Sequence, residues 1–134
     1  MITQAIERKI MNKPNQGIKT VIYPVKDIAR AKALFRNFLG VEPYVDQPYY
    51  VGFKVGDQDI GLDPNGHKAG VTAYYHVDDI RKSLQLLVDS SAPVLQEVKD
   101  VGGGKLIALV RDAEGNLIGL VQSPTDTKKL GVES

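Results

Sequence analysis

The chain has 134 residues, and its 17 basic and 16 acidic side chains give it a formal net charge of +1. This length suits one domain with a core of its own, and the balanced charge gives no electrostatic reason to expect nucleic acid or an anionic membrane as a partner. The absence of cysteine excludes disulfides and thiolate metal sites. Because no apolar run approaches the ~20 residues needed to cross a bilayer, we expect a soluble cytoplasmic protein.

Residues 1–17 are expected to form an arm outside the main domain. Four apolar residues in it follow approximately helical spacing: Ile2, Ala5, Ile6 and Ile10. We interpret this segment as a short amphipathic helix that lies on the domain or on a partner subunit. At the other end, residues 124–134 are expected to form a polar tail.

Residues 18–64 are expected to form a first folding unit. The β-branched run over residues 18–25 predicts a strand, Asp27 can cap the helix that follows, and Gly40 can end it. The apolar positions between these caps predict a helix with one buried face: Ala31, Leu34, Phe35, Phe38 and Leu39.

A hairpin closes the first unit. Residues 49–55 and 58–62 are two strand-like runs joined by a two-residue turn of Gly and Asp. This register places Lys54 opposite Asp59, where the two side chains are expected to form a cross-strand ion pair.

Residues 70–123 repeat the first unit. The string Val77-Asp78-Asp79-Ile80 matches Val25-Lys26-Asp27-Ile28 at an offset of 52 residues, and Ile118-Gly119-Leu120 matches Ile60-Gly61-Leu62. The second pair of strings is 58 residues apart, so the second unit carries a longer insertion. Each unit is therefore predicted to have the order β-α-β-β-β, within one domain that spans residues 18–123.

The remaining elements of the second unit follow the same pattern. A helix is predicted through four apolar positions: Ile80, Leu84, Leu87 and Val88. Residues 94–98 are expected to form a strand, and residues 105–122 a closing hairpin. We interpret the glycines at 102–104 between them as a flexible rim that could close over a ligand.

The chain resembles a known superfamily. Val77-Asp78-Asp79-Ile80, followed by Arg111-Asp112-Ala113-Glu114-Gly115-Asn116-Leu117-Ile118-Gly119-Leu120-Val121, is similar to the glyoxalase, bleomycin-resistance protein and extradiol dioxygenase superfamily, also called vicinal oxygen chelate proteins. The internal repeat supports this resemblance. It implies an α+β fold in which two tandem βαβββ units form a cupped mixed sheet with helices on the outer face.

The resemblance also implies where a divalent metal would be bound. In metal-dependent members the ligands lie on the first and last strands of each unit, and the matching positions here are Thr20, Gly61, Thr72 and Gly119. None is a usual ligand, because glycine has no side chain and a neutral threonine hydroxyl is a weak donor. We therefore expect no metal, no cofactor and no catalytic residue of the superfamily type.

Other residues offer little to rebuild a metal site. Strand alternation places His76 on the same face as Thr72 and Tyr74, but one histidine and one paired carboxylate make a poor metal cage. The second histidine, His67, is expected to be a solvated loop residue.

The concave face of the sheet is instead expected to hold an organic ligand. Gly52 lies opposite Gly61 in the predicted hairpin, and these glycines would leave volume in the cup. The candidate ligand-binding residues are Thr20, Ile22, Tyr50, Gly61, Thr72, Tyr74, His76, Leu109, Arg111, Leu117, Gly119 and Val121. The alternative is that neighbouring side chains fill this space and that the glycines ease the curvature of the sheet.

The opposite face of the sheet is expected to pack against the two helices and to form the core. Strand alternation assigns ten residues to it: Val21, Tyr23, Val25, Tyr49, Val51, Phe53, Tyr75, Val77, Ile118 and Leu120.

Three functions remain open. The first is a metal-free protein that sequesters an apolar or aromatic small molecule, similar to the bleomycin-resistance branch, in which homodimers commonly form the binding clefts. The second is a metal-dependent lyase or dioxygenase of the same superfamily with a non-standard site. The third is a structural dimerisation module without a ligand.

Overall fold

The computed structural model describes residues 15–65 and 70–124, which form two successive units. The first unit comprises β1 (Asn15–Pro24), α2 (Ile28–Leu39), β2 (Val45–Gln47), β3 (Tyr50–Val55) and β4 (Gln58–Asp63). The second comprises β5 (Thr72–Val77), α3 (Ile80–Asp89), β6 (Val94–Asp100), β7 (Leu106–Arg111) and β8 (Leu117–Gln122). The predicted β-α-β-β-β order is confirmed in both units.

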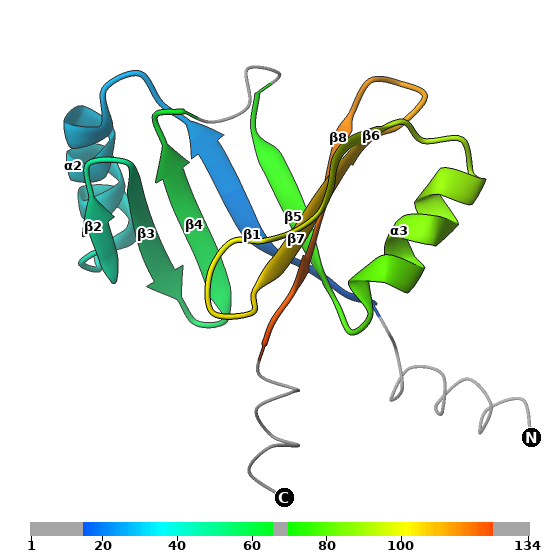
Figure 1. Cartoon of the computed structure of the whole chain (residues 1–134). Helices are drawn as coiled ribbons and strands as arrows, with labels where there is room; N and C mark the ends of the chain where they lie inside the picture. Colours follow the sequence, from blue (N-terminus) through cyan, green and yellow to red (C-terminus); the bar gives the residue numbers. More distant parts are fainter. Residues whose placement is uncertain (1–14, 66–69, 125–134) are drawn as a thin grey trace, which may run out of the picture.

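All eight described strands belong to one curled, mixed sheet in the order β2-β3-β4-β1-β5-β8-β7-β6 (Figure 1). The first strand of each unit pairs in parallel with the last strand of the same unit, and β1 pairs with β5 in antiparallel fashion at the centre. The two units are thus related by an approximate twofold arrangement about the β1–β5 pair. The predicted α+β class with a cupped sheet is confirmed.

Both helices begin as the sequence predicts. The Asp27 carboxylate accepts a hydrogen bond of 3.0 Å from the Arg30 amide, and the Asp79 carboxylate accepts one of 3.1 Å from the Lys82 amide. These caps satisfy amides that the first helical turn leaves without a partner. At the end of α2, Gly40 has a φ of 73°, a left-handed conformation that glycine adopts without steric cost.

Each helix covers its own part of the sheet, and the helices lie at opposite ends of the molecule (Figure 1). Under α3, the core is built from Val77, Ile80, Leu84, Ala108, Val110 and Leu120. Under α2, it is built from Val51, Phe53 and Leu62, with Phe35 of the helix packed against them. The predicted core face of the sheet is therefore confirmed for most of its residues.

The structure corrects the prediction for α2. Leu34 and Phe38 are 63% and 78% exposed, and no residue of the helix is fully buried. The helix packs on the sheet through a narrower stripe than the apolar spacing indicated, which contains Ala31, Phe35 and Leu39.

Strand boundaries and two core residues also differ from the prediction. Val21 is half-buried and belongs to neither core. β1 begins at Asn15, so it includes the last residues assigned to the N-terminal arm, and β6 extends to Asp100. Tyr49 is 65% exposed and not part of the core, because it lies with Pro48 in the turn between β2 and β3, where strand alternation does not apply.

Several predictions fall outside the described residues. These concern most of the N-terminal arm, the polar tail beyond Pro124, and the loop residue His67. Among the helices described, none is long and apolar enough to cross a membrane.

Candidate ligand-binding site

A pocket of about 570 Å³ lies on the face of the sheet opposite the two cores. We call it the tyrosine pocket. It is lined by Thr20, Ile22, Tyr44, Val45, Tyr49, Tyr50, Asp63, Tyr74, Val101, Lys105, Ile107 and Val121. Both units contribute to it, since seven of these residues belong to the first unit and five to the second. Its volume and its mainly aromatic and aliphatic walls are typical of small-molecule sites.

The two central glycines do not open this pocket as predicted. A Cβ on Gly119 would lie 2.5 Å from the Tyr74 ring, and one on Gly61 would lie 2.6 Å from Ile22 and still closer to the Tyr50 hydroxyl. The space above both glycines is therefore filled by neighbouring side chains, which was the alternative interpretation. The glycines allow Tyr50 and Tyr74 to lie against the sheet, and the pocket lies beyond these rings.

At one end of the pocket, Thr20 and His76 are joined side chain to side chain. The Thr20 hydroxyl and His76 Nε2 are 2.8 Å apart and share a hydrogen bond. Thr20 is only 6% exposed, and His76 is half-buried. Burial lowers the pKa of His76, and the positive charges of Lys105 and Lys19 lower it further. The neutral imidazole is thus favoured at this position.

The four positions expected to bind a superfamily metal do not suit one. Thr20 is hydrogen-bonded to His76, Thr72 is buried, and the two glycines are covered by tyrosine rings. Within residues 15–65 and 70–124, no group of three or more His, Cys, Asp or Glu side chains could hold a metal ion. The donor set therefore does not fit the metal that the resemblance implies.

A polar cluster on the first unit fixes one tyrosine of the pocket. The predicted ion pair is present, with Lys54 Nζ 3.2 Å from the Asp59 carboxylate. The Tyr44 hydroxyl donates a hydrogen bond of 2.6 Å to the same carboxylate, and Lys54 Nζ lies 4.8 Å from the centre of the Tyr44 ring. Burial and this hydrogen bond raise the pKa of Tyr44. Tyr44 is therefore held as a neutral phenol at the pocket.

Tyr50 and Tyr74 experience the negative charge of carboxylates on the first unit. Burial raises the pKa of Tyr50 to about 12, with further contributions from Asp59 and Asp63. Burial and Asp63 also raise the pKa of Tyr74. These tyrosines present neutral rings and hydroxyl groups to a ligand.

The structure brings together five of the predicted site residues as pocket lining: Thr20, Ile22, Tyr50, Tyr74 and Val121. Gly61, Gly119, Thr72 and His76 lie next to these residues without lining the pocket. Arg111 pairs with Leu117 across the β7–β8 turn.

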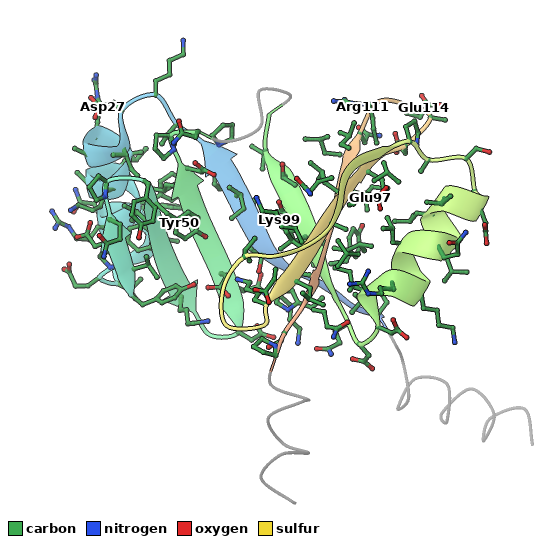
Figure 2. The ribbon with its side chains drawn as sticks, viewed as in Figure 1. Asp27, Tyr50, Glu97, Lys99, Arg111 and Glu114 are labelled. Atoms are coloured by element: carbon green, nitrogen blue, oxygen red, sulfur yellow. The ribbon has the colours of Figure 1, made fainter. Side chains whose placement is uncertain are left out.

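Three predicted residues of the β7–β8 hairpin do not line the pocket. Leu109 is buried in the middle of β7 opposite Gly119, whereas Arg111 and Leu117 pair next to the turn. Arg111 donates a hydrogen bond of 2.8 Å to the carbonyl of Gly115 within its own turn. Figure 2 shows Arg111 and Glu114 together at this turn, well away from Tyr50.

Seven lining residues were absent from the prediction: Tyr44, Val45, Tyr49, Asp63, Val101, Lys105 and Ile107. Ile107 was accessible to sequence reasoning, because strand alternation places it on the same face as Leu109. Tyr44, Tyr49, Val101 and Lys105 lie in or beside connections, whose positions the strand pattern does not determine.

The fold and the pocket define a class of protein in which two βαβββ units share one curled sheet around a concave site. A model of the Glyoxalase/Bleomycin resistance protein/Dioxygenase superfamily matches residues 17–120. The chain therefore belongs to this superfamily. A comparison with curated protein sequences gives no match.

Solved structures share the fold at low sequence identity. Methylmalonyl-CoA epimerase from Mycobacterium tuberculosis is 19% identical with a TM-score of 0.65, over 86% of this chain and 93% of the epimerase. A superfamily member from Vibrio splendidus 12B01 is 20% identical with a TM-score of 0.62, over 78% and 97%. A hypothetical protein from Bacillus halodurans C-125 is 16% identical with a TM-score of 0.67, over 83% and 96%.

Proposed function

We propose that this protein is a metal-independent, cytoplasmic binding protein that sequesters an apolar or aromatic small molecule in the tyrosine pocket. The observation that carries the proposal is the grouping of Tyr44, Tyr49, Tyr50 and Tyr74 around one pocket of suitable volume. Aromatic side chains favour planar apolar ligands through burial and ring stacking. The poor fit of the superfamily metal positions supports binding without a metal.

Fluorescence titration with 8-anilinonaphthalene-1-sulfonate tests this proposal, because the dye is aromatic and brightens in apolar sites. Tyr49→Ala should weaken binding by roughly threefold to tenfold through the loss of one aromatic wall. Since Tyr49 is largely exposed, the fold should persist in this variant. Phe38→Ala is the matched control, because it removes another largely exposed aromatic side chain, from α2.

A chelator separates binding from metal-dependent chemistry. Titrations with and without EDTA should give the same affinity. Loss of binding in EDTA would support the alternative of a metal-dependent lyase or dioxygenase with a non-standard site. No dye binding at all would contradict the proposal and favour a structural dimerisation module.

We also propose that the protein is a homodimer, as the superfamily resemblance implies. Gel filtration with light scattering should give twice the mass of the 134-residue chain. A mass equal to one chain at all concentrations tested would contradict this part of the proposal.

A further inference from the structure

The two charged side chains in the tyrosine pocket come from different units and have opposite signs. Asp63 is the last residue of β4, and Lys105 immediately precedes β7. They are the only carboxylate and ammonium side chains among the described pocket-lining residues. A pocket of purely apolar function needs neither charge, so their placement indicates what kind of ligand the pocket selects.

Strand register places Asp63 at one end of the pocket. Asp63 pairs with Pro24 on β1, whereas Asp59 pairs with Thr20. The two pairs are four positions apart along the strands, which is about 13 Å at the usual rise per residue. Asp63 thus lies well along the sheet from Thr20, which lines the pocket nearer its other end.

Lys105 lies toward the Thr20 end. His76, which is hydrogen-bonded to Thr20, pairs with Val121, and Val121 pairs with Ile107. His76, Val121 and Ile107 thus form a row across β5, β8 and β7, and Ile107 is two residues from Lys105. The effect of Lys105 on the pKa of His76 agrees with this placement.

Both charges remain available to a ligand. Among residues 15–65 and 70–124, neither Asp63 nor Lys105 forms an ion pair, whereas Asp59 is paired with Lys54. One oxygen of Asp63 accepts a hydrogen bond of 2.8 Å from the Asn65 amide, which orients the carboxylate without neutralising it. Asp63 also raises the pKa values of Tyr50 and Tyr74, so its field reaches the aromatic walls.

We propose that the pocket selects an elongated, zwitterionic aromatic compound, with its cationic group at Asp63, its anionic group at Lys105 and its rings against the tyrosines. This inference rests on the proposed binding function and specifies the ligand class. Polyanionic ligands such as nucleotides are disfavoured, because Asp63 would repel them. A simple apolar ligand would leave both charges without a partner.

Ciprofloxacin is a suitable probe, because it is a fluorescent fused-ring compound with a piperazinium at one end and a carboxylate at the other. Its methyl ester lacks the anion, and its N-acetyl derivative lacks the cation. Fluorescence anisotropy should show that the parent compound binds about twofold to fivefold more tightly than either derivative, as expected for partly exposed ion pairs.

Charge-neutralising variants test which pocket residue binds each charged end of the ligand. Lys105→Met should abolish the preference for ciprofloxacin over its methyl ester, and Asp63→Asn should abolish the preference over the N-acetyl derivative. Asn at position 63 keeps an oxygen that accepts the hydrogen bond of the Asn65 amide, so the turn should persist. The matched controls are Lys82→Met on α3 and Glu114→Gln at the β7–β8 turn, which Figure 2 shows well away from Tyr50. Neither control should change either preference.

The outcomes distinguish this inference from the function on which it rests. Equal affinity for the three compounds, or no binding of any of them while the anilinonaphthalene dye still binds, would overturn the zwitterion inference and leave the binding function intact. If neither the dye nor the three compounds bind, both proposals fall. Raising the salt concentration should reduce the preference, since it screens exposed charges.

Discussion

Thr20 and His76 are 56 residues apart in the chain, yet the Thr20 hydroxyl and His76 Nε2 are 2.8 Å apart. The contact joins the first strand of one unit to the first strand of the other. It forms because β1 and β5 are neighbours at the centre of the sheet. Thr20, one of the positions at which the superfamily resemblance implies a metal ligand, is thus hydrogen-bonded to the only histidine among the described residues.

The lowered pKa of His76 predicts how stability depends on pH. Folding favours the neutral ring, so the unfolded chain binds more protons once the pH falls below the ordinary histidine pKa near 6.5. The contribution of His76 to stability should be complete above this pKa and should be lost as the pH falls toward the lower folded value.

Thermal unfolding between about pH 7.5 and pH 5.5 checks this prediction. His76→Gln should flatten the profile, because glutamine does not titrate and can still hydrogen-bond to Thr20. His67→Gln serves as the control for the other histidine. An unchanged profile in His76→Gln would contradict the assignment.

The packing of Tyr74 on Gly119 predicts a destabilising effect of a single methyl group. Gly119→Ala would place its Cβ 2.5 Å from the Tyr74 ring, so the ring must move. Overpacking of this kind costs about 1–3 kcal/mol, which urea unfolding would measure. The loss should be much smaller in a Tyr74→Ala background. Equal losses in the two backgrounds would show that the ring is not the cause.

The turn between β7 and β8 depends on Asp112. Its Oδ1 accepts hydrogen bonds of 2.9 Å from the Glu114 amide and 2.7 Å from the Asn116 amide. These bonds, chiefly those from Asn116, lower the pKa of Asp112. Because the folded pKa is depressed, this stabilisation is present above the ordinary value of 3.8 and is lost as the pH falls through the folded value.

Substitution of Asp112 should therefore lower the melting temperature at neutral pH. Asp112→Ala should lower it more than Asp112→Asn, since asparagine keeps one acceptor for the amides. Ala113→Ser changes an exposed residue of the same turn and should have little effect. Similar losses in Asp112→Ala and Asp112→Asn would show that the charge, and not the turn geometry, carries the stabilisation.

The donor set at Thr20, Gly61, Thr72 and Gly119 predicts weak metal binding. Protein purified without chelator and then offered Zn, Ni, Mn and Fe(II) should retain less than ~0.1 equivalent of each by elemental mass spectrometry. Retention near one equivalent that is lost in His76→Ala would contradict the prediction and support the metal-dependent alternative.

Much of the fold follows from the sequence because it depends on local patterns. Asp27 and Asp79 cap helices that are built from local backbone contacts, and the hairpin register of Lys54 with Asp59 follows from a short turn. The repeated Ile-Gly-Leu sequence indicated two related units, because repeated sequence motifs at similar spacing predict repeated structural units. The helix caps and the hairpin depend only on residues that are close together in the chain.

The site depends on contacts between distant segments, and only the tertiary structure decided it. Strand alternation placed Tyr50 and Tyr74 on the correct face, but it gave no measure of how far their rings reach over Gly61 and Gly119. Lys105 enters the pocket because the β6–β7 loop extends toward the first unit. Side-chain conformation and loop path have no periodic signal in the sequence, so the residues that line the pocket are determined only when both units share one sheet.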